Sequence, residues 1–162
     1  YCEFALGTFI SLGKERTEQV LDIFMKEVIE PMINIYILRV LHKHYEAGDT
    51  LLLASATNSI LVNKIGARLE FKNIIGTDPE INEGNITGKI LGVPAIGEGK
   101  LKKVKSWMNE NGKVDFSETT FYSDSINDLP LLLEVEVPIA VNPDNMLREE
   151  AINQGWEIID LI

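Results

Sequence analysis

The sequence predicts an α/β fold built on a mostly parallel, doubly wound sheet. Strand-like and helix-like segments alternate from residue 50 to residue 160, which is the pattern of repeated β–α–β units with right-handed crossovers. The strand-like segments are short, continuous apolar runs such as "TLLLASAT", and such runs are typical of strands that are buried on both faces.

The segment before the first strand is predicted to be helical. Apolar residues at helical spacing predict a helix over residues 14–30. Pro31 is expected in the first turn of a second helix, which ends at Gly48. The opening "YCEFALG" carries no initiator methionine and no clear cap, so we expect that a preceding segment is absent. Residues 1–30 are interpreted as a helical accessory piece beside a core that starts at residue 31.

The predicted core alternates strands and helices. Strands are predicted over residues 50–57, 71–76, 119–123, 137–142 and 156–160, with helices over residues 58–69, 100–112, 127–134 and 144–155. Residues 78–92 carry Glu-Gly-Asn between two short alternating segments, which predicts a β-hairpin or flap.

Composition narrows the class of partner. The chain has 25 acidic and 15 basic residues, a net charge of −10 and no basic stripe, which disfavours nucleic acid and anionic membranes as partners. A small phosphorylated metabolite stays compatible, because local lysines, backbone amides and a metal ion can override a negative field. One cysteine, no membrane-length apolar run and no signal peptide predict a cytoplasmic protein.

Polar residues with the chemistry of phosphoryl transfer follow the predicted strands. Ser55 ends the first strand, Lys100 stands beside two glycines, and Asp124 and Asp128 lie four residues apart after the third strand. Carboxylate oxygens are ligands for Mg²⁺, and a fixed ammonium can hold phosphate oxygens. Parallel sheets bind their ligands beyond the carboxyl ends of their strands.

Each of these residues also has a purely structural interpretation. Ser55 could cap a helix, and Lys100 alone is typical of a solvated helix lysine. Asp124 and Asp128 are common as turn and helix-start residues. A plain α/β structural domain would therefore have to contain four such residues in this order by coincidence.

The order of these residues resembles the haloacid dehalogenase superfamily of phosphohydrolases, and within it the subfamily IB, phosphoserine-phosphatase-like enzymes. The blocks "HKHYEAGDTLLLASAT", "GEGKLKKVKSWM", "FYSDSINDLPLL" and "VPIAVNPDNMLREEAINQGW" each look like a family block. "YSDSINDLPLL" followed by "AVNPD" is the most specific of these signals, and the resemblance runs over nearly the whole chain.

The resemblance implies a phosphate-binding role for three residues. Ser55 matches the second family motif, in which the hydroxyl and the following backbone N–H, here that of Ala56, bind the transferring phosphoryl group. Lys100 matches the lysine of the third motif, which holds the nucleophile and the phosphate together. This fits the use of fixed charges and dipoles to stabilise a transferring phosphoryl group.

The resemblance also implies a Mg²⁺ site. Asp124 matches the metal ligand of the fourth motif, and Asp128 matches the acid that supports metal-bound water and the lysine, so both are assigned to the metal. Asn127 matches a residue that lines the phosphate and metal site. Lys100 and Asp128 are the catalytic candidates within this chain.

The chain departs from the family at the first motif. Nothing in residues 1–162 reads Asp-x-Asp, the motif that supplies the nucleophile and the acid/base from the central first strand. We therefore expect an absent N-terminal segment that completes the sheet, and the 162 residues alone should be inactive as a phosphatase. The resemblance implies a remnant of a helical cap over residues 1–30 and, over residues 31–162, a Rossmann-like core that lacks its first strand.

The predicted function of the intact protein is Mg²⁺-dependent hydrolysis of a phosphomonoester through an aspartyl-phosphate. Phosphoserine and histidinol phosphate are the candidate substrates from the subfamily. Two alternatives stay open: a non-catalytic relative that binds metal or phosphate, and a receiver-like signalling domain. The order of Ser, Lys and acids disfavours the receiver, which needs its acidic pair on an early strand.

Overall fold

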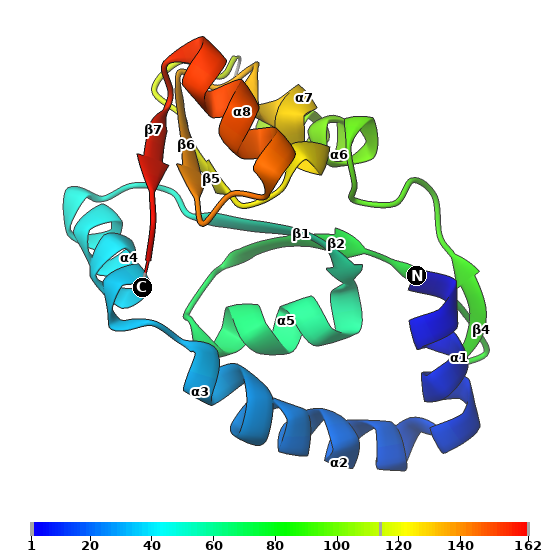
Figure 1. The fold of residues 1–162 in the computed structure, drawn as a ribbon. Helices are drawn as coiled ribbons and strands as arrows, with labels where there is room; N and C mark the ends of the chain where they lie inside the picture. Colours follow the sequence, from blue (N-terminus) through cyan, green and yellow to red (C-terminus); the bar gives the residue numbers. More distant parts are fainter. Residues whose placement is uncertain (1, 114, 162) are drawn as a thin grey trace. The chain divides into compact units, whose positions relative to one another are not determined.

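The computed structural model describes residues 2–113 and 115–161, with side chains from Leu6 onward (Figure 1). The chain forms two compact units, which divide between Pro94 and Ala95. The assignment of residues 1–30 to a cap is a different division and stays a prediction, and Tyr1 lies outside the described residues.

Helices form the first half of the N-terminal unit. They are α1 (Cys2–Leu12), α2 (Lys14–Phe24), the π-helical turn η1 (Met25–Ile29), α3 (Glu30–Met32) and α4 (Ile35–Ala47). Helix α4 starts at Asn34, whose side chain accepts the N–H of Tyr36 at 2.7 Å. The single helix predicted from Pro31 to Gly48 is wrong, because Pro31 lies in the first turn of the three-residue helix α3 and a separate helix, α4, begins after its cap Asn34. Gly48 ends α4 in the left-handed conformation, as predicted.

A two-stranded parallel sheet follows these helices. It pairs β1 (Leu52–Asn58) with β2 (Asn73–Thr77), and α5 (Ser59–Arg68) connects the two strands. The sheet and α5 approach closely, since a Cβ added at Gly76 would lie 2.8 Å from the Cα of Ser59. Only glycine fits there. Among the described residues, β1 has β2 as its single strand partner.

Ion pairs join α5 to the helices that precede it. Lys64 lies 2.8 Å from a carboxylate oxygen of Glu18 and 2.7 Å from one of Asp22, both on α2. Arg68 makes two hydrogen bonds to the carboxylate of Glu30, at the start of α3. The segment α2–η1–α3 is therefore tethered to α5 on both sides of the π-helical turn.

The N-terminal unit closes with the predicted hairpin. Strands β3 (Pro79–Asn82) and β4 (Asn85–Ile90) pair antiparallel. The two turn residues, Glu83 and Gly84, have φ values of 48° and 80°, which is the conformation that a tight two-residue hairpin requires. Helix α1 packs against β4, so the flap and the first helix form one substructure.

The C-terminal unit is a compact α/β layer. Its elements are α6 (Glu98–Glu110), β5 (Thr120–Ser123), the 3₁₀ turn η2 (Ile126–Asp128), α7 (Leu129–Leu132), β6 (Val137–Val141), α8 (Asn145–Gln154) and β7 (Glu157–Ile159). The three strands pair in parallel in the order β5-β6-β7, and Figure 1 shows α8 across one face of them. The core cluster consists of Leu132, Ala140, Leu147 and Ala151.

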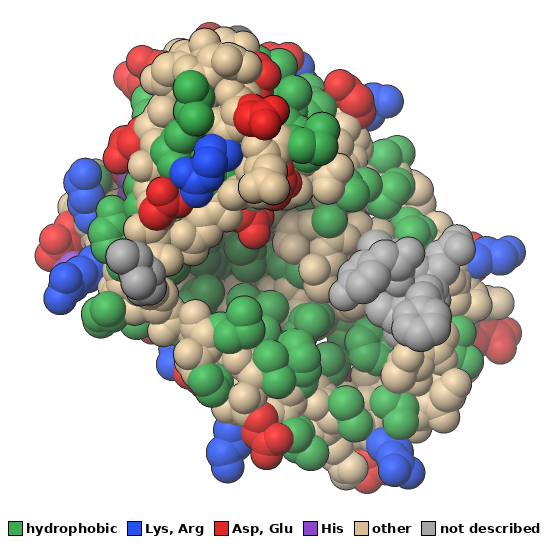
Figure 2. All heavy atoms as spheres, viewed as in Figure 1, with side chains coloured by type: hydrophobic (Ala, Val, Ile, Leu, Met, Phe, Trp, Pro, Cys, Tyr) green, Lys and Arg blue, Asp and Glu red, His purple; other side chains and the backbone are tan. Residues whose placement is uncertain are grey.

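These observations agree with a mostly parallel sheet, since the β3–β4 hairpin is the one antiparallel pair within the described part of the chain. None of the described helices is long and apolar enough to cross a bilayer. On the face drawn in Figure 2, basic side chains are scattered among acidic and apolar ones rather than gathered in a stripe. The exclusion of nucleic acid as a partner stays a prediction from the charge of the chain.

Candidate active site at the carboxyl end of β5

The loop after β5 positions three of the predicted site residues. The strand ends at Ser123, Asp124 follows directly, and Asn127 and Asp128 lie in the 3₁₀ turn η2. The hydroxyl of Ser125 begins that turn by accepting the N–H of Asn127 at 3.3 Å. These side chains are therefore held at the carboxyl end of a parallel strand, where ligands bind in open α/β sheets.

Lys100 and Asp128 form a buried ion pair. The Nζ atom of Lys100 lies 2.5 Å from Oδ1 of Asp128, and the two side chains are 6% and 10% exposed. Lys100 is the third residue of α6, which begins after Gly97, whose φ of 55° favours glycine. The ammonium also lies 5.9 Å from the centre of the Phe121 ring. The interpretation of Lys100 as a solvated lysine is thus wrong, because buried charges persist in proteins when they are paired.

The other oxygen of Asp128 is held by a residue that the sequence analysis did not single out. The hydroxyl of Ser123 donates to Oδ2 of Asp128 at 2.7 Å, and Ser123 is buried. Phe121 and Ser123 lie two residues apart on β5, so they point to the same face of the strand. The alternation of side chains along β5 could have identified Ser123 from the sequence, since Phe121 and Ser123 share the face that contacts the Lys100–Asp128 pair.

Asp124 differs from Asp128 in its exposure and in its side-chain partners. Its side chain is exposed and has no hydrogen-bond or ion-pair partner within the described residues. Its backbone carbonyl accepts the N–H of Asp144 at 2.8 Å. Asn127 is exposed as well, and its side-chain amide donates to the hydroxyl of Ser125 at 3.2 Å. The carboxylate of Asp124 is therefore available to a ligand.

The predicted Mg²⁺ fits this site in part. Among the described residues, no three His, Cys, Asp or Glu side chains gather in a group that could hold a metal ion. Mg²⁺ binds oxygen ligands, keeps several waters and uses only one or two carboxylates at sites where it meets phosphate. The unpartnered carboxylate of Asp124 suits that role. Asp128, which already holds Lys100 and Ser123, suits a supporting role, and both metal assignments stay predictions.

Ser55 and Ala56 lie in the N-terminal unit, within β1. The hydroxyl of Ser55 accepts the N–H of Thr57 at 3.2 Å, and the carbonyl of Ala56 accepts the hydroxyl of Thr77 at 2.8 Å. The side chain of Asn58 then caps α5 by accepting the N–H of Leu61 at 3.1 Å. Side-chain hydrogen bonds therefore fix the end of β1 and the start of α5, and the assignment of Ser55 and Ala56 to a phosphate stays a prediction.

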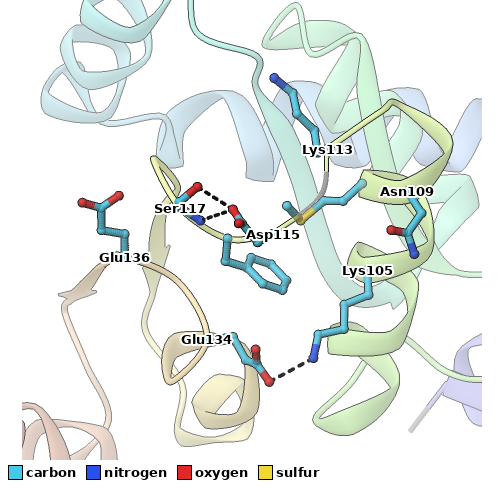
Figure 3. A pocket seen from close by; sticks show the side chains of 9 residues that line it. Lys105, Asn109, Lys113, Asp115, Ser117, Glu134 and Glu136 are labelled. Atoms are coloured by element: carbon cyan, nitrogen blue, oxygen red, sulfur yellow. Dashed lines mark hydrogen bonds and ion pairs between the residues drawn. The ribbon is translucent and has the colours of Figure 1, made fainter.

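A pocket of about 680 Å³ in the C-terminal unit lies away from these residues. Figure 3 shows its polar lining, including the ion pair of Lys105 with Glu134 and the hydrogen bonds of Asp115 with Ser117. These residues come from the second half of α6, from the segment before β5 and from the loop between α7 and β6. The pocket is thus at the amino-terminal end of β5, opposite to Asp124.

The chain is similar to a family of hydrolases and to proteins that are named phosphatases. The family described as haloacid dehalogenase-like hydrolase matches residues 2–133. A histidinol-phosphatase of Neisseria meningitidis is 36% identical over 99% of this chain and 73% of its own length. A phosphoserine phosphatase (SerB1) of Mycobacterium tuberculosis is 38% identical over 72% of this chain. The match covers 38% of that protein, so the chain spans well under half of this relative.

Solved structures resemble the chain as well. A protein of unknown function from Bordetella pertussis Tohama I has a TM-score of 0.94 and 38% identity over 99% of this chain and 73% of its own. A substrate-bound phosphoserine phosphatase has a TM-score of 0.60 over 75% of this chain and 56% of its own, at 19% identity, which speaks for the fold alone. The predicted fold class, a mixed α/β fold with mostly parallel sheets, is confirmed.

Proposed function

This chain belongs to the haloacid dehalogenase-like hydrolase family, and from that premise we propose that it forms part of a Mg²⁺-dependent phosphomonoester hydrolase of subfamily IB. The observation that carries the proposal is the buried Lys100–Asp128 pair beside the exposed carboxylate of Asp124. A buried ammonium and a free carboxylate at one strand end supply a cation for phosphate oxygens and a ligand for a metal. Relatives that are named phosphatases support the same reaction.

Four residues of the C-terminal unit each have a distinct role in this proposal. The ammonium of Lys100 neutralises the oxygens of the transferring phosphoryl group, and Asp128 holds that ammonium in place. Ser123 fixes the orientation of Asp128 from its second oxygen. Asp124 would hold Mg²⁺, which when bound supplies further positive charge to the phosphate. Preorganised charge of this kind needs no rearrangement during the reaction.

Ser55 and Ala56 are proposed to bind a phosphoryl group through a hydroxyl and a backbone N–H. The support is the resemblance of "LLLASAT" to the second family motif, together with the position of Ser55 just before the start of α5. Backbone N–H groups near the start of a helix attract anions.

The nucleophile is proposed to be an aspartate on a further segment, because the chain has no Asp-x-Asp. Its carboxylate oxygen would attack phosphorus while the ester P–O bond breaks and the leaving oxygen takes a proton. Water would then attack the aspartyl-phosphate, releasing inorganic phosphate and restoring the carboxylate. Within the described residues, β1 and β5 are each paired on one edge only, so each sheet can accept an added strand.

Two substrates are proposed, histidinol phosphate and phosphoserine. Histidinol phosphate comes first, because the relative with a matching name aligns over 99% of this chain. The relative named for phosphoserine aligns over 72%. The cytoplasmic location stays a prediction from the sequence.

The test is Mg²⁺-dependent hydrolysis of histidinol phosphate, phosphoserine and an aryl phosphate by the full-length protein that contains this chain. We expect turnover that chelation abolishes, with a preference for one of the two metabolites. Absence of turnover together with Mg²⁺ binding would favour the non-catalytic alternative. The receiver-like alternative is not retained, since the chain belongs to a hydrolase family.

A further inference from the structure

Asp144 makes two hydrogen bonds that link two loops of the C-terminal unit and a third that caps its own helix. Its backbone N–H donates to the carbonyl of Asp124 at 2.8 Å. One carboxylate oxygen, Oδ2, accepts the N–H of Ile126 at 2.9 Å, and the other, Oδ1, accepts the N–H of Leu147 at 2.8 Å. The sequence analysis placed Asp144 only at the start of a predicted helix, and the contact with Leu147 is indeed the cap of α8.

The chain before Asp144 directs it towards the β5 loop. Asn142 follows β6 with a φ of 44°, a conformation that asparagine adopts more readily than most residues. Its side chain accepts the N–H of Leu161 at 2.7 Å, which fixes the turn. Pro143 is buried and its ring fixes its own φ. Asp144 is therefore presented from a rigid turn and not from a flexible loop.

The two contacts on the β5 loop fix the peptide groups on either side of Ser125. The carbonyl of Asp124 and the N–H of Ile126 are both bound by Asp144. The side chain of Asp124 has no partner of its own among the described residues. The backbone therefore sets the position from which this side chain extends, and Asp144 holds that backbone.

We propose that Asp144 is a positioning residue that holds Asp124 in the orientation required to bind a divalent cation. The inference rests on the proposed function to the extent that Asp124 is its metal ligand. Partners that orient a metal ligand typically contribute about 10- to 100-fold to metal affinity.

The chemistry of the contacts explains why an aspartate is needed. A serine at position 144 can still cap α8, because serine and aspartate are equally good caps. Its single hydroxyl cannot also reach the N–H of Ile126. The two N–H groups bind different oxygens of Asp144, and an asparagine replaces one of these oxygens with an NH₂ donor, so one of the two contacts is lost. Asp144→Ser therefore removes the side-chain contact with Ile126, while it keeps the cap and the backbone N–H contact with the carbonyl of Asp124.

The experiment compares wild type, Asp144→Ser and Asp144→Asn in the full-length protein. Asn34→Ala is the matched control, since it removes the cap of α4 without touching the β5 loop. Amide hydrogen exchange of Ile126 in metal-free protein measures the hydrogen bond between its N–H and the side chain of Asp144. Calorimetric titration with Mg²⁺ reports the metal site, and hydrolysis of an aryl phosphate reports the activity.

In Asp144→Ser we expect faster exchange at Ile126 and about 10- to 100-fold weaker Mg²⁺ binding, with Asn34→Ala unchanged in both. Asp144→Asn should weaken Mg²⁺ binding as well. Unchanged Mg²⁺ affinity in Asp144→Ser, or no Mg²⁺ binding by wild type, would overturn the inference. If wild type binds Mg²⁺ and the variant binds it weakly but neither hydrolyses the ester, the inference holds and the proposed function fails.

Discussion

The two units of the molecule use ion pairs in opposite ways. In the C-terminal unit, Lys100 and Asp128 are 6% and 10% exposed and lie at the end of a strand. In the N-terminal unit, Lys64 and Asp22 are 26% and 70% exposed and join two helices. Removal from water makes a charge costly unless it is paired, whereas a solvated pair gains little. We infer that the first pair serves chemistry and the second serves only the packing of helices.

The largest effect is expected from Lys100→Met. Loss of the ammonium leaves the charge of Asp128 buried without a cation, which typically costs about 3–5 kcal/mol of unfolding free energy. Turnover should fall at least about 100-fold, as for removal of one oxyanion donor. Urea unfolding and initial rates measure the two effects.

Lys105→Met is the matched control for that substitution. Lys105 lies on the same helix, pairs with Glu134 at 2.9 Å and is 46% exposed. It should change stability by less than about 1 kcal/mol. Equal losses of unfolding free energy in Lys100→Met and Lys105→Met would contradict the distinction between the buried and the exposed pair.

Asp124→Asn should separate activity from stability. The side chain is exposed and without a partner in the described residues, so unfolding free energy should change by no more than about 0.5 kcal/mol. Turnover should fall by about two to three orders of magnitude, because a neutral amide is a poor Mg²⁺ ligand. Retention of wild-type turnover would remove Asp124 from the proposed metal site.

Ser123→Ala should have an intermediate effect on stability. It leaves Oδ2 of Asp128 buried without its hydroxyl donor, which typically costs about 1–3 kcal/mol. Ser106→Ala is the control, since Ser106 bonds Glu110 at 3.1 Å on an exposed face of α6. If thermal unfolding gives both variants the same small change, Ser123 does not hold the pair.

Lys64→Met should have the smallest mutational effect. It removes contacts with Glu18 and Asp22, and exposed pairs are worth about 0.2–1 kcal/mol each at low salt. The difference from wild type should shrink as NaCl is raised, since salt screens solvated charges. A loss that 1 M NaCl leaves unchanged would show that this pair is not a solvated one.

Asp144 is a carboxylate that backbone N–H groups stabilise instead of a cation, and its effect on stability should depend on pH. Hydrogen bonds from the N–H groups of Leu147 and Ile126 lower the pKa of Asp144 from its usual 3.8. The resulting stabilisation is complete above the unfolded pKa and is lost as pH falls through the lower folded pKa. Acid unfolding of wild type and Asp144→Ser should therefore converge at low pH. A constant gap between them from pH 7 to pH 2 would contradict the assignment.

The sequence predicted the elements whose signals are local. The β3–β4 hairpin followed from Glu-Gly-Asn, the end of α4 from Gly48, and the fold class from the alternation of elements. It did not predict the burial of Lys100, because burial depends on strands that are distant in sequence. The second contact of Asp144 was missed for the same reason, since it joins two separate loops. Ser123 lies only five residues before Asp128, and it was missed although the alternation of β5 gave a signal. Residues 1–30 were predicted to be helical, but their division into α1 and α2 was not predicted.

The π-helical turn η1 has a consequence for how this chain tolerates changes in length. An α-helix rotates about 100° per residue, so Asp22 and Glu30, eight residues apart, would point about 80° apart on a regular helix. A π turn takes up one extra residue, which returns Glu30 to the face that α5 contacts. The turn has the geometry of a one-residue insertion. Deleting one residue within Met25–Ile29 should keep both tethers in register, whereas a deletion within α2 should rotate one away from the other.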